Sequence, residues 1–160
     1  MFYGVKPDEG AALGEGGVHL DPKDYHKKMA EKDAVIVDVR NHYEADIGKF
    51  NKQEKVGGAK YIDPKMRKST DFKEWLSKEE TKKQLAGKQV LMYCTGGVRC
   101  ERASQIIKSE IGDSVKGVFQ LKGGIEKYMM EFPGDKMSRQ LLACCLLRNP
   151  KWAGKRQADV

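Results

Sequence analysis

The sequence contains few of the features that mark secreted, membrane or metal-binding proteins. Only four of its 160 residues are cysteine, so a disulfide framework is not expected and the thiols should be reduced. The longest apolar run, 141–147, has seven residues and is too short to cross a bilayer. No basic segment followed by an apolar core precedes residue 30, so we expect no signal peptide, no membrane partner and a cytoplasmic location.

Acidic residues are nearly absent from the last 25 positions, and this accounts for most of the net charge of +7. The stretch 136–160 carries a net +5, which leaves +2 for the first 135 residues. Its one acidic residue is Asp159, and its six basic residues are Lys136, Arg139, Arg148, Lys151, Lys155 and Arg156. Overall charge is therefore a weak argument for nucleic-acid binding by the domain itself.

Composition divides the chain into three parts. Residues 1–17 contain five glycines and no periodic pattern, which is typical of a flexible leader. Residues 18–134 hold the periodic segments and form the expected domain. Residues 135–160 are expected to be a basic tail, with a short helix and then disorder. The adjacent pair Cys144 and Cys145 in that tail has poor spacing for a metal site.

Apolar runs alternate with helical patterns along the middle of the chain, which predicts an α/β fold with a mostly parallel sheet of about five strands and helices on both faces. The expected strands are 18–20, 34–39, 60–62, 90–93 and 115–121. The expected helices are 22–31, 71–85, one that begins at Arg99, and 125–131.

Cys94 follows the most apolar of these strands and precedes a helix, with a glycine pair between them. A loop that winds into a helix N-terminus turns several backbone N–H groups towards one point, where they favour negative charge. Arg99 adds a permanent positive charge. These features predict a reactive Cys94 thiolate, and the alternative is an inert cysteine buried at a strand end.

The motif Cys94-Thr95-Gly96-Gly97-Val98-Arg99 resembles the active-site loop of rhodanese domains. Two further motifs occur in that family's order, Asp38-Val39-Arg40 upstream and Leu121-Lys122-Gly123-Gly124 downstream. The residues in all three motifs resemble those of the branch that contains bacterial rhodanese-type tRNA wobble-uridine hydroxylases and their eukaryotic relatives. The related phosphatases and arsenate reductases have a loop one residue longer, and the six-residue loop here argues against a phosphatase.

The resemblance implies a single-domain sulfurtransferase that needs no cofactor and no metal. Cys94 would take sulfur from a small anionic donor such as thiosulfate and hold it as a persulfide. The N–H groups of the next five residues would bind that persulfide, namely Thr95, Gly96, Gly97, Val98 and Arg99. An acceptor, which the sequence does not specify, would remove the sulfur. A tRNA-modifying enzyme remains an alternative, with tRNA as its partner, and so does a non-catalytic interaction module, although an intact Cys94 argues against the latter.

Several supporting residues lie at the same edge of the predicted sheet. Asp38 is expected to fix loops through hydrogen bonds, and Arg40 either does the same or adds positive field around the sulfur. Glu44, expected on a short turn, could pair with a loop residue or with Arg40. Lys122 is either a charge beside the substrate or an ordinary surface lysine.

The glycine turn that contains Lys122 has a role only by resemblance. Gly123 and Gly124 would lie beside the cysteine loop and could enlarge the anion site.

Cys100 stands six residues after the nucleophile, on the first turn of the expected helix. It could resolve an oxidised or persulfidated Cys94 as a disulfide, which would make the protein a redox relay. Alternatively it is a small residue that packs the start of the helix.

Overall fold

The computed structural model describes residues 16–47, 50, 57–68 and 70–132. Within this part, five strands form one sheet in the order β1-β5-β4-β2-β3, and every neighbouring pair is parallel. The strands are β1 (Val18–Leu20), β2 (Ala34–Asp38), β3 (Lys60–Ile62), β4 (Gln89–Tyr93) and β5 (Gly117–Leu121). The predicted five-stranded parallel sheet is therefore confirmed.

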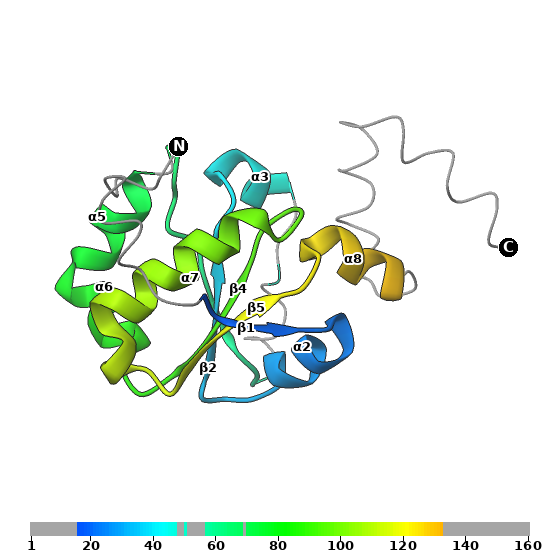
Figure 1. Ribbon diagram of the computed structural model, residues 1–160, viewed down its shortest axis with the longest axis horizontal. Coiled ribbons are helices and arrows are strands. Elements are labelled where there is room, and N and C mark those ends of the chain that lie inside the picture. Colours follow the sequence, from blue (N-terminus) through cyan, green and yellow to red (C-terminus); the bar gives the residue numbers. More distant parts are fainter. Residues whose placement is uncertain (1–15, 48–49, 51–56, 69, 133–160) are drawn as a thin grey trace, which may run out of the picture.

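Helices cover both faces of this sheet (Figure 1). They are α2 (Pro22–Met29), α3 (His42–Ile47), α5 (Asp71–Ser77), α6 (Glu79–Leu85), α7 (Val98–Ile111) and α8 (Gly124–Glu131), with a short 3-10 turn at Gly112–Ser114. Of the helices in the described residues, none is long and apolar enough to span a membrane. Residues 1–15 of the leader, residues 51–56 and the tail with Cys144 and Cys145 lie outside the described residues, so the predictions for the leader and the tail stay predictions.

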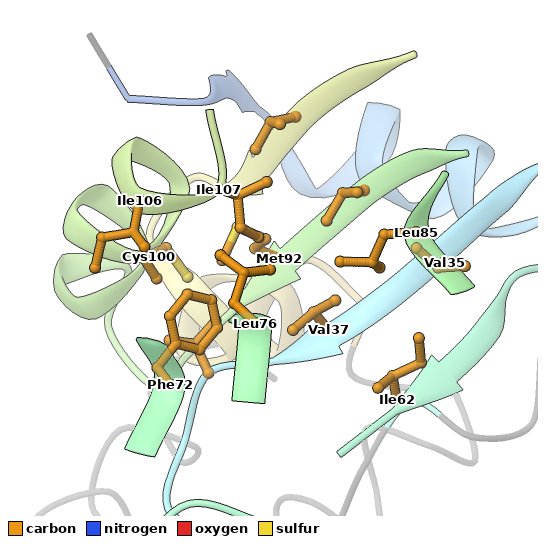
Figure 2. Packing of buried hydrophobic residues seen from close by; sticks show 14 of the residues in the cluster. Val35, Val37, Ile62, Phe72, Leu76, Leu85, Met92, Cys100, Ile106 and Ile107 are labelled. Atoms are coloured by element: carbon orange, nitrogen blue, oxygen red, sulfur yellow. The ribbon is translucent and has the colours of Figure 1, made fainter. Parts of the chain in front are cut away.

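The alternation of side chains along each strand builds two cores, one on each face of the sheet. In β2, Val35 and Val37 pack on one face, while Ala34 and Ile36 pack on the other. The first core lies under α5, α6 and α7, and Figure 2 shows its apolar side chains between those helices and the sheet. The second core lies under α2 and α8 and is rich in aromatic rings. Because β2 and β4 are buried on both faces, their sequences are almost wholly apolar.

The single helix predicted over 71–85 is wrong. The structure has two helices, because Lys78 adopts an extended backbone with ψ at 136° and separates α5 from α6. The break lets both pieces place apolar side chains on the first core, Phe72 and Leu76 from α5 and Leu85 from α6. One straight helix over this span would turn part of that apolar stripe away from the sheet.

The short turn predicted around Glu44 is also wrong, since this residue lies within helix α3. The backbone N–H of Asn41 donates to the Glu44 carboxylate (3.0 Å), which closes the first turn of the helix. The chain enters α3 directly from the carboxyl end of β2, so Glu44 is carried to the edge of the sheet where β4 also ends. This placement brings Glu44 to the cysteine loop.

Candidate active site

The central strand β4 delivers Cys94 to the carboxyl edge of the sheet, between the ends of β2 and β5. The residues that follow turn sharply, and Gly97 takes a left-handed conformation (φ 89°) immediately before α7. This turn aims the Gly97 N–H at the Cys94 Sγ, at 3.0 Å. Cys94 is 1% exposed, so its side chain lies at the floor of the loop rather than on its rim.

The pKa of Cys94 is lowered from 9.0 to about 6, and the largest cause is a hydrogen bond from the Cys100 thiol. Burial opposes this change, whereas the backbone N–H groups of Cys100 and Arg99 and the charge of Arg99 act in the same direction as the thiol. With a pKa of about 6, roughly nine-tenths of Cys94 is thiolate at pH 7. A thiol that is largely ionised at neutral pH can react without a separate general base.

Cys100 lies in the first turn of α7, fully buried among the apolar side chains that this helix turns towards the sheet (Figure 2). Burial raises the pKa of its thiol well above the usual value, and the hydrogen bond to Cys94 raises it further. Cys100 therefore keeps its proton beside the Cys94 thiolate. Both sulfurs belong to the same buried cluster.

Arg99 is held by Glu44 and Thr95 at the mouth of the loop. Its guanidinium donates to both carboxylate oxygens of Glu44, at 2.9 and 3.2 Å, and to the Thr95 hydroxyl at 3.0 Å. The Thr95 hydroxyl in turn donates to Glu44 (3.0 Å). Glu44 was expected to pair with a loop residue or with Arg40, and the structure shows it bound to the loop residues Thr95 and Arg99. These three side chains form a closed ring that joins both ends of the loop to α3.

Asp38 and Arg40 form a buried ion pair beneath the loop. Asp38 is fully buried and accepts hydrogen bonds from the Arg40 Nε (2.9 Å), the Arg40 Nη2 (2.7 Å) and the Tyr93 hydroxyl (2.8 Å). The Tyr61 hydroxyl donates to the same carboxylate at 2.9 Å. This cluster ties the ends of β2, β3 and β4 together.

The charge of Arg40 is matched by Asp38 beside it. Burial lowers the pKa of Arg40, but contact with Tyr93 and Asp38 raises it overall, so Arg40 stays charged. A field of Arg40 on the sulfur stays a prediction. The two tyrosines had no recognisable signal in the sequence, because each reads as an ordinary residue of an apolar strand.

The second glycine turn packs directly against the cysteine loop. Gly123 and Gly124 have positive φ angles of 76° and 66°, and a Cβ at Gly124 would lie 2.7 Å from the carbonyl oxygen of Cys94. The N–H groups of Ile125 and Glu126 donate to the carbonyl oxygens of Cys94 (2.9 Å) and Thr95 (3.2 Å). The N-terminus of α8 thus holds the outer side of the loop.

Three members of the predicted site are exposed, namely Gly96, Val98 and Lys122. Lys122 begins this turn and is exposed, and its backbone N–H pairs with β1. Val98 is 83% exposed and lies on the outer surface of the loop. Within the described residues, no group of three or more histidine, cysteine or acidic side chains could hold a metal ion.

A parallel α/β sheet whose central strand ends in a thiolate, inside a loop lined by N–H groups, defines a class of cysteine-dependent domains. Residues 21–131 match the family model of the rhodanese-like domain. The chain belongs to the rhodanese-like domain family, as its three motifs predicted.

Curated relatives include the rhodanese-like domain-containing protein 6 of Arabidopsis thaliana, 38% identical over 136 residues. They also include a tRNA uridine(34) hydroxylase of Brucella ovis, 40% identical over 120 residues. These alignments take in 81% and 75% of this chain but only 22% and 35% of the relatives. The chain therefore spans between a fifth and about a third of the length of these proteins.

Solved structures agree on the fold. One is Ygr203w of Saccharomyces cerevisiae, described as a homologue of single-domain rhodanese and of the Cdc25 phosphatase catalytic domain. It is 19% identical with a TM-score of 0.50, over 75% of this chain and 84% of that one. An uncharacterised protein of the same yeast is 18% identical with a TM-score of 0.52, over 72% and 92% of the two chains.

Proposed function

We propose that this protein is a sulfurtransferase in which Cys94 carries sulfur as a persulfide. The observation that carries the proposal is the Cys94 sulfur itself, with a pKa of about 6 and the Gly97 N–H at 3.0 Å. A thiolate at this depth can reach only a small donor, and the surrounding N–H groups suit a sulfur that bears negative charge.

The proposed reaction has two displacements. The Cys94 thiolate attacks the outer sulfur of a donor such as thiosulfate, the donor's S–S bond breaks, and sulfite leaves with the electron pair. The N–H groups of the loop, from Thr95 to Arg99, hold the resulting persulfide. An acceptor nucleophile then attacks the outer sulfur, and Cys94 leaves as the thiolate that began the cycle.

Intact mass spectrometry tests this function directly. The protein is incubated with an excess of thiosulfate or of methanethiosulfonate, beside a Cys94→Ser variant that removes only the nucleophile. We expect the wild type alone to gain one sulfur atom and to lose it on addition of cyanide. No gain with either donor, in protein whose thiols are reduced, would refute the proposal.

A second candidate is modification of tRNA, and the observation in its favour is the 40% identity with a tRNA uridine(34) hydroxylase. The strongly basic stretch 136–160 would supply contacts to phosphate groups. We expect RNA to copurify with the protein and to bind less tightly as salt rises. Deletion of 136–160 should weaken that binding, and a deletion without effect would count against this candidate.

A third candidate is a redox relay, favoured by the presence of Cys94 and Cys100 in one buried cluster, where each thiol shifts the pKa of the other. Peroxide would oxidise Cys94 to the sulfenic acid, and the Cys100 sulfur would displace water to form a disulfide. A thiol reductant would restore both cysteines. The Cys100→Ser variant should then recover poorly from peroxide, and recovery equal to that of the wild type would end this idea.

A further inference from the structure

The positive charge at the mouth of the cysteine loop is already matched by a negative one. The Arg99 guanidinium meets both oxygens of the Glu44 carboxylate, at 2.9 and 3.2 Å, in the two-pronged geometry that makes arginine–carboxylate pairs strong. The Glu44 side chain is only 20% exposed, and that of Arg99 is 34% exposed. The pair is therefore partly shielded from solvent. Charges interact more strongly in such surroundings than in water.

Glu44 is charged at any pH at which the protein would work. Burial raises the pKa of this carboxyl, but the hydrogen bonds from Arg99, the Asn41 N–H and Thr95 outweigh it and bring the pKa to about 2. Three separate groups thus hold the carboxylate in one position, two of them from the cysteine loop and one from the start of α3. A donor that enters the loop meets Arg99 together with this negative partner.

The remaining charges near the loop add little net attraction for an anion. Arg40 is matched by the buried Asp38. Cys94 as a thiolate contributes a further negative charge, and the N–H groups of the loop are already directed at it. Each additional negative charge on a donor therefore meets repulsion from the sulfur and from Glu44, against the attraction of Arg99.

We propose that Glu44 selects the donor by charge, so that sulfane-sulfur donors with a single negative charge, such as thiosulfonates and persulfides, are favoured over the thiosulfate dianion. This inference rests on the sulfurtransferase function proposed above and narrows its substrate class. In this role Glu44 touches no reacting atom. It positions Arg99 and reduces the positive potential that a donor meets.

The test compares two donors of nearly the same size, methanethiosulfonate with one negative charge and thiosulfate with two. The variant Glu44→Gln keeps the shape of the side chain and removes its charge. Removing one negative charge near the donor should raise kcat/KM about threefold for the monoanion and about tenfold for the dianion, chiefly through KM. The preference for methanethiosulfonate over thiosulfate should then fall about threefold.

The opposite change should have the opposite effect. Arg99→Gln removes the positive partner, so the preference for the monoanion should rise about threefold. Two controls separate charge from shape. Glu44→Asp keeps the charge and should retain the wild-type preference even if both rates fall. Glu74→Gln removes the same charge from an exposed position on α5 and should change neither rate.

The ratio between donors decides the outcome, because a displaced loop would slow both donors alike. An unchanged ratio in Glu44→Gln, or a shift in the same direction in Arg99→Gln, would overturn the inference while leaving the sulfurtransferase function in place. If neither donor transfers sulfur to Cys94 of the wild type, the proposed function itself fails and the inference falls with it.

Discussion

The low pKa of Cys94, to which the neighbouring Cys100 thiol contributes most, predicts how the Cys94 thiolate responds to pH. Replacing Cys100 by alanine removes the thiol that contributes most to the low pKa of Cys94. A hydrogen bond to a charged group contributes about 1.5 kcal/mol, and one pKa unit corresponds to about 1.4 kcal/mol. We therefore expect the pKa of Cys94 to rise by about one unit, from about 6 to about 7.

The rate of alkylation by iodoacetamide measures this pKa, because only the thiolate reacts. A thiolate of higher pKa is also the better nucleophile, by about threefold for one unit. The Cys100→Ala variant should therefore react about threefold more slowly than the wild type at pH 5 and about threefold faster at pH 8.5. The two profiles should cross near pH 6.5, as follows from these two factors.

Two variants make this experiment specific. Cys100→Ser keeps a hydrogen-bond donor at the same position and should leave the profile close to that of the wild type. Cys94→Ser reports the reaction of every other cysteine and is subtracted. A Cys100→Ala profile that coincides with the wild type at all pH values would refute the argument, since it would show that the neighbouring thiol does not stabilise the thiolate.

Three further predictions concern stability. Asp38→Asn should lower the free energy of unfolding in urea by about 3 kcal/mol, because it removes the carboxylate charge that accepts two hydrogen bonds from the buried Arg40 guanidinium; a loss below about 1 kcal/mol would contradict this. Gly124→Ala should destabilise the domain and slow persulfide formation, whereas Gly96→Ala, which meets no atom within 4 Å, should do neither. Glu44 has a pKa of about 2 in the folded protein against 4.5 for the free side chain. The ionised carboxylate therefore stabilises the folded state above pH 5, and this contribution is lost as the pH falls from 4.5 towards 2. Glu44→Gln should remove about 2 kcal/mol from the pH-dependent part of the free energy of unfolding, measured from urea midpoints between pH 2 and pH 6.

Much of the fold could be predicted from local pattern alone. The runs that became β2 and β4 are apolar because both their faces are covered, and a fully buried strand leaves a clear signal in the sequence. The loop around Cys94 also had a local signal, since a cysteine, two glycines and an arginine lie within six residues. The break at Lys78 did not, because it arises from the need of α5 and α6 to reach one core, and that is a property of the packed structure.

Contacts between distant residues account for what the sequence could not predict at the site. Glu44 had two candidate partners, and only the arrangement of β2 beside β4 decides that Arg99 is bound. Tyr61 and Tyr93 carry no sign of their hydroxyl contacts with Asp38, because a strand pattern tells which face a side chain takes but not what its polar end meets. The position of Cys100 in the same buried cluster as Cys94 likewise depends on how tightly the loop turns, which Gly97 permits.

The hydrogen bonds from α8 to the cysteine loop also determine which way the peptide dipoles of that loop point. The carbonyl groups of Cys94 and Thr95 are drawn outward by the N–H groups of Ile125 and Glu126. In a trans peptide the N–H points opposite to the carbonyl, so the amides of the next residues, Thr95 and Gly96, must face away from α8. A helix that begins some thirty residues later in the chain thereby sets the orientation of these two peptide groups, and it does so through backbone atoms alone.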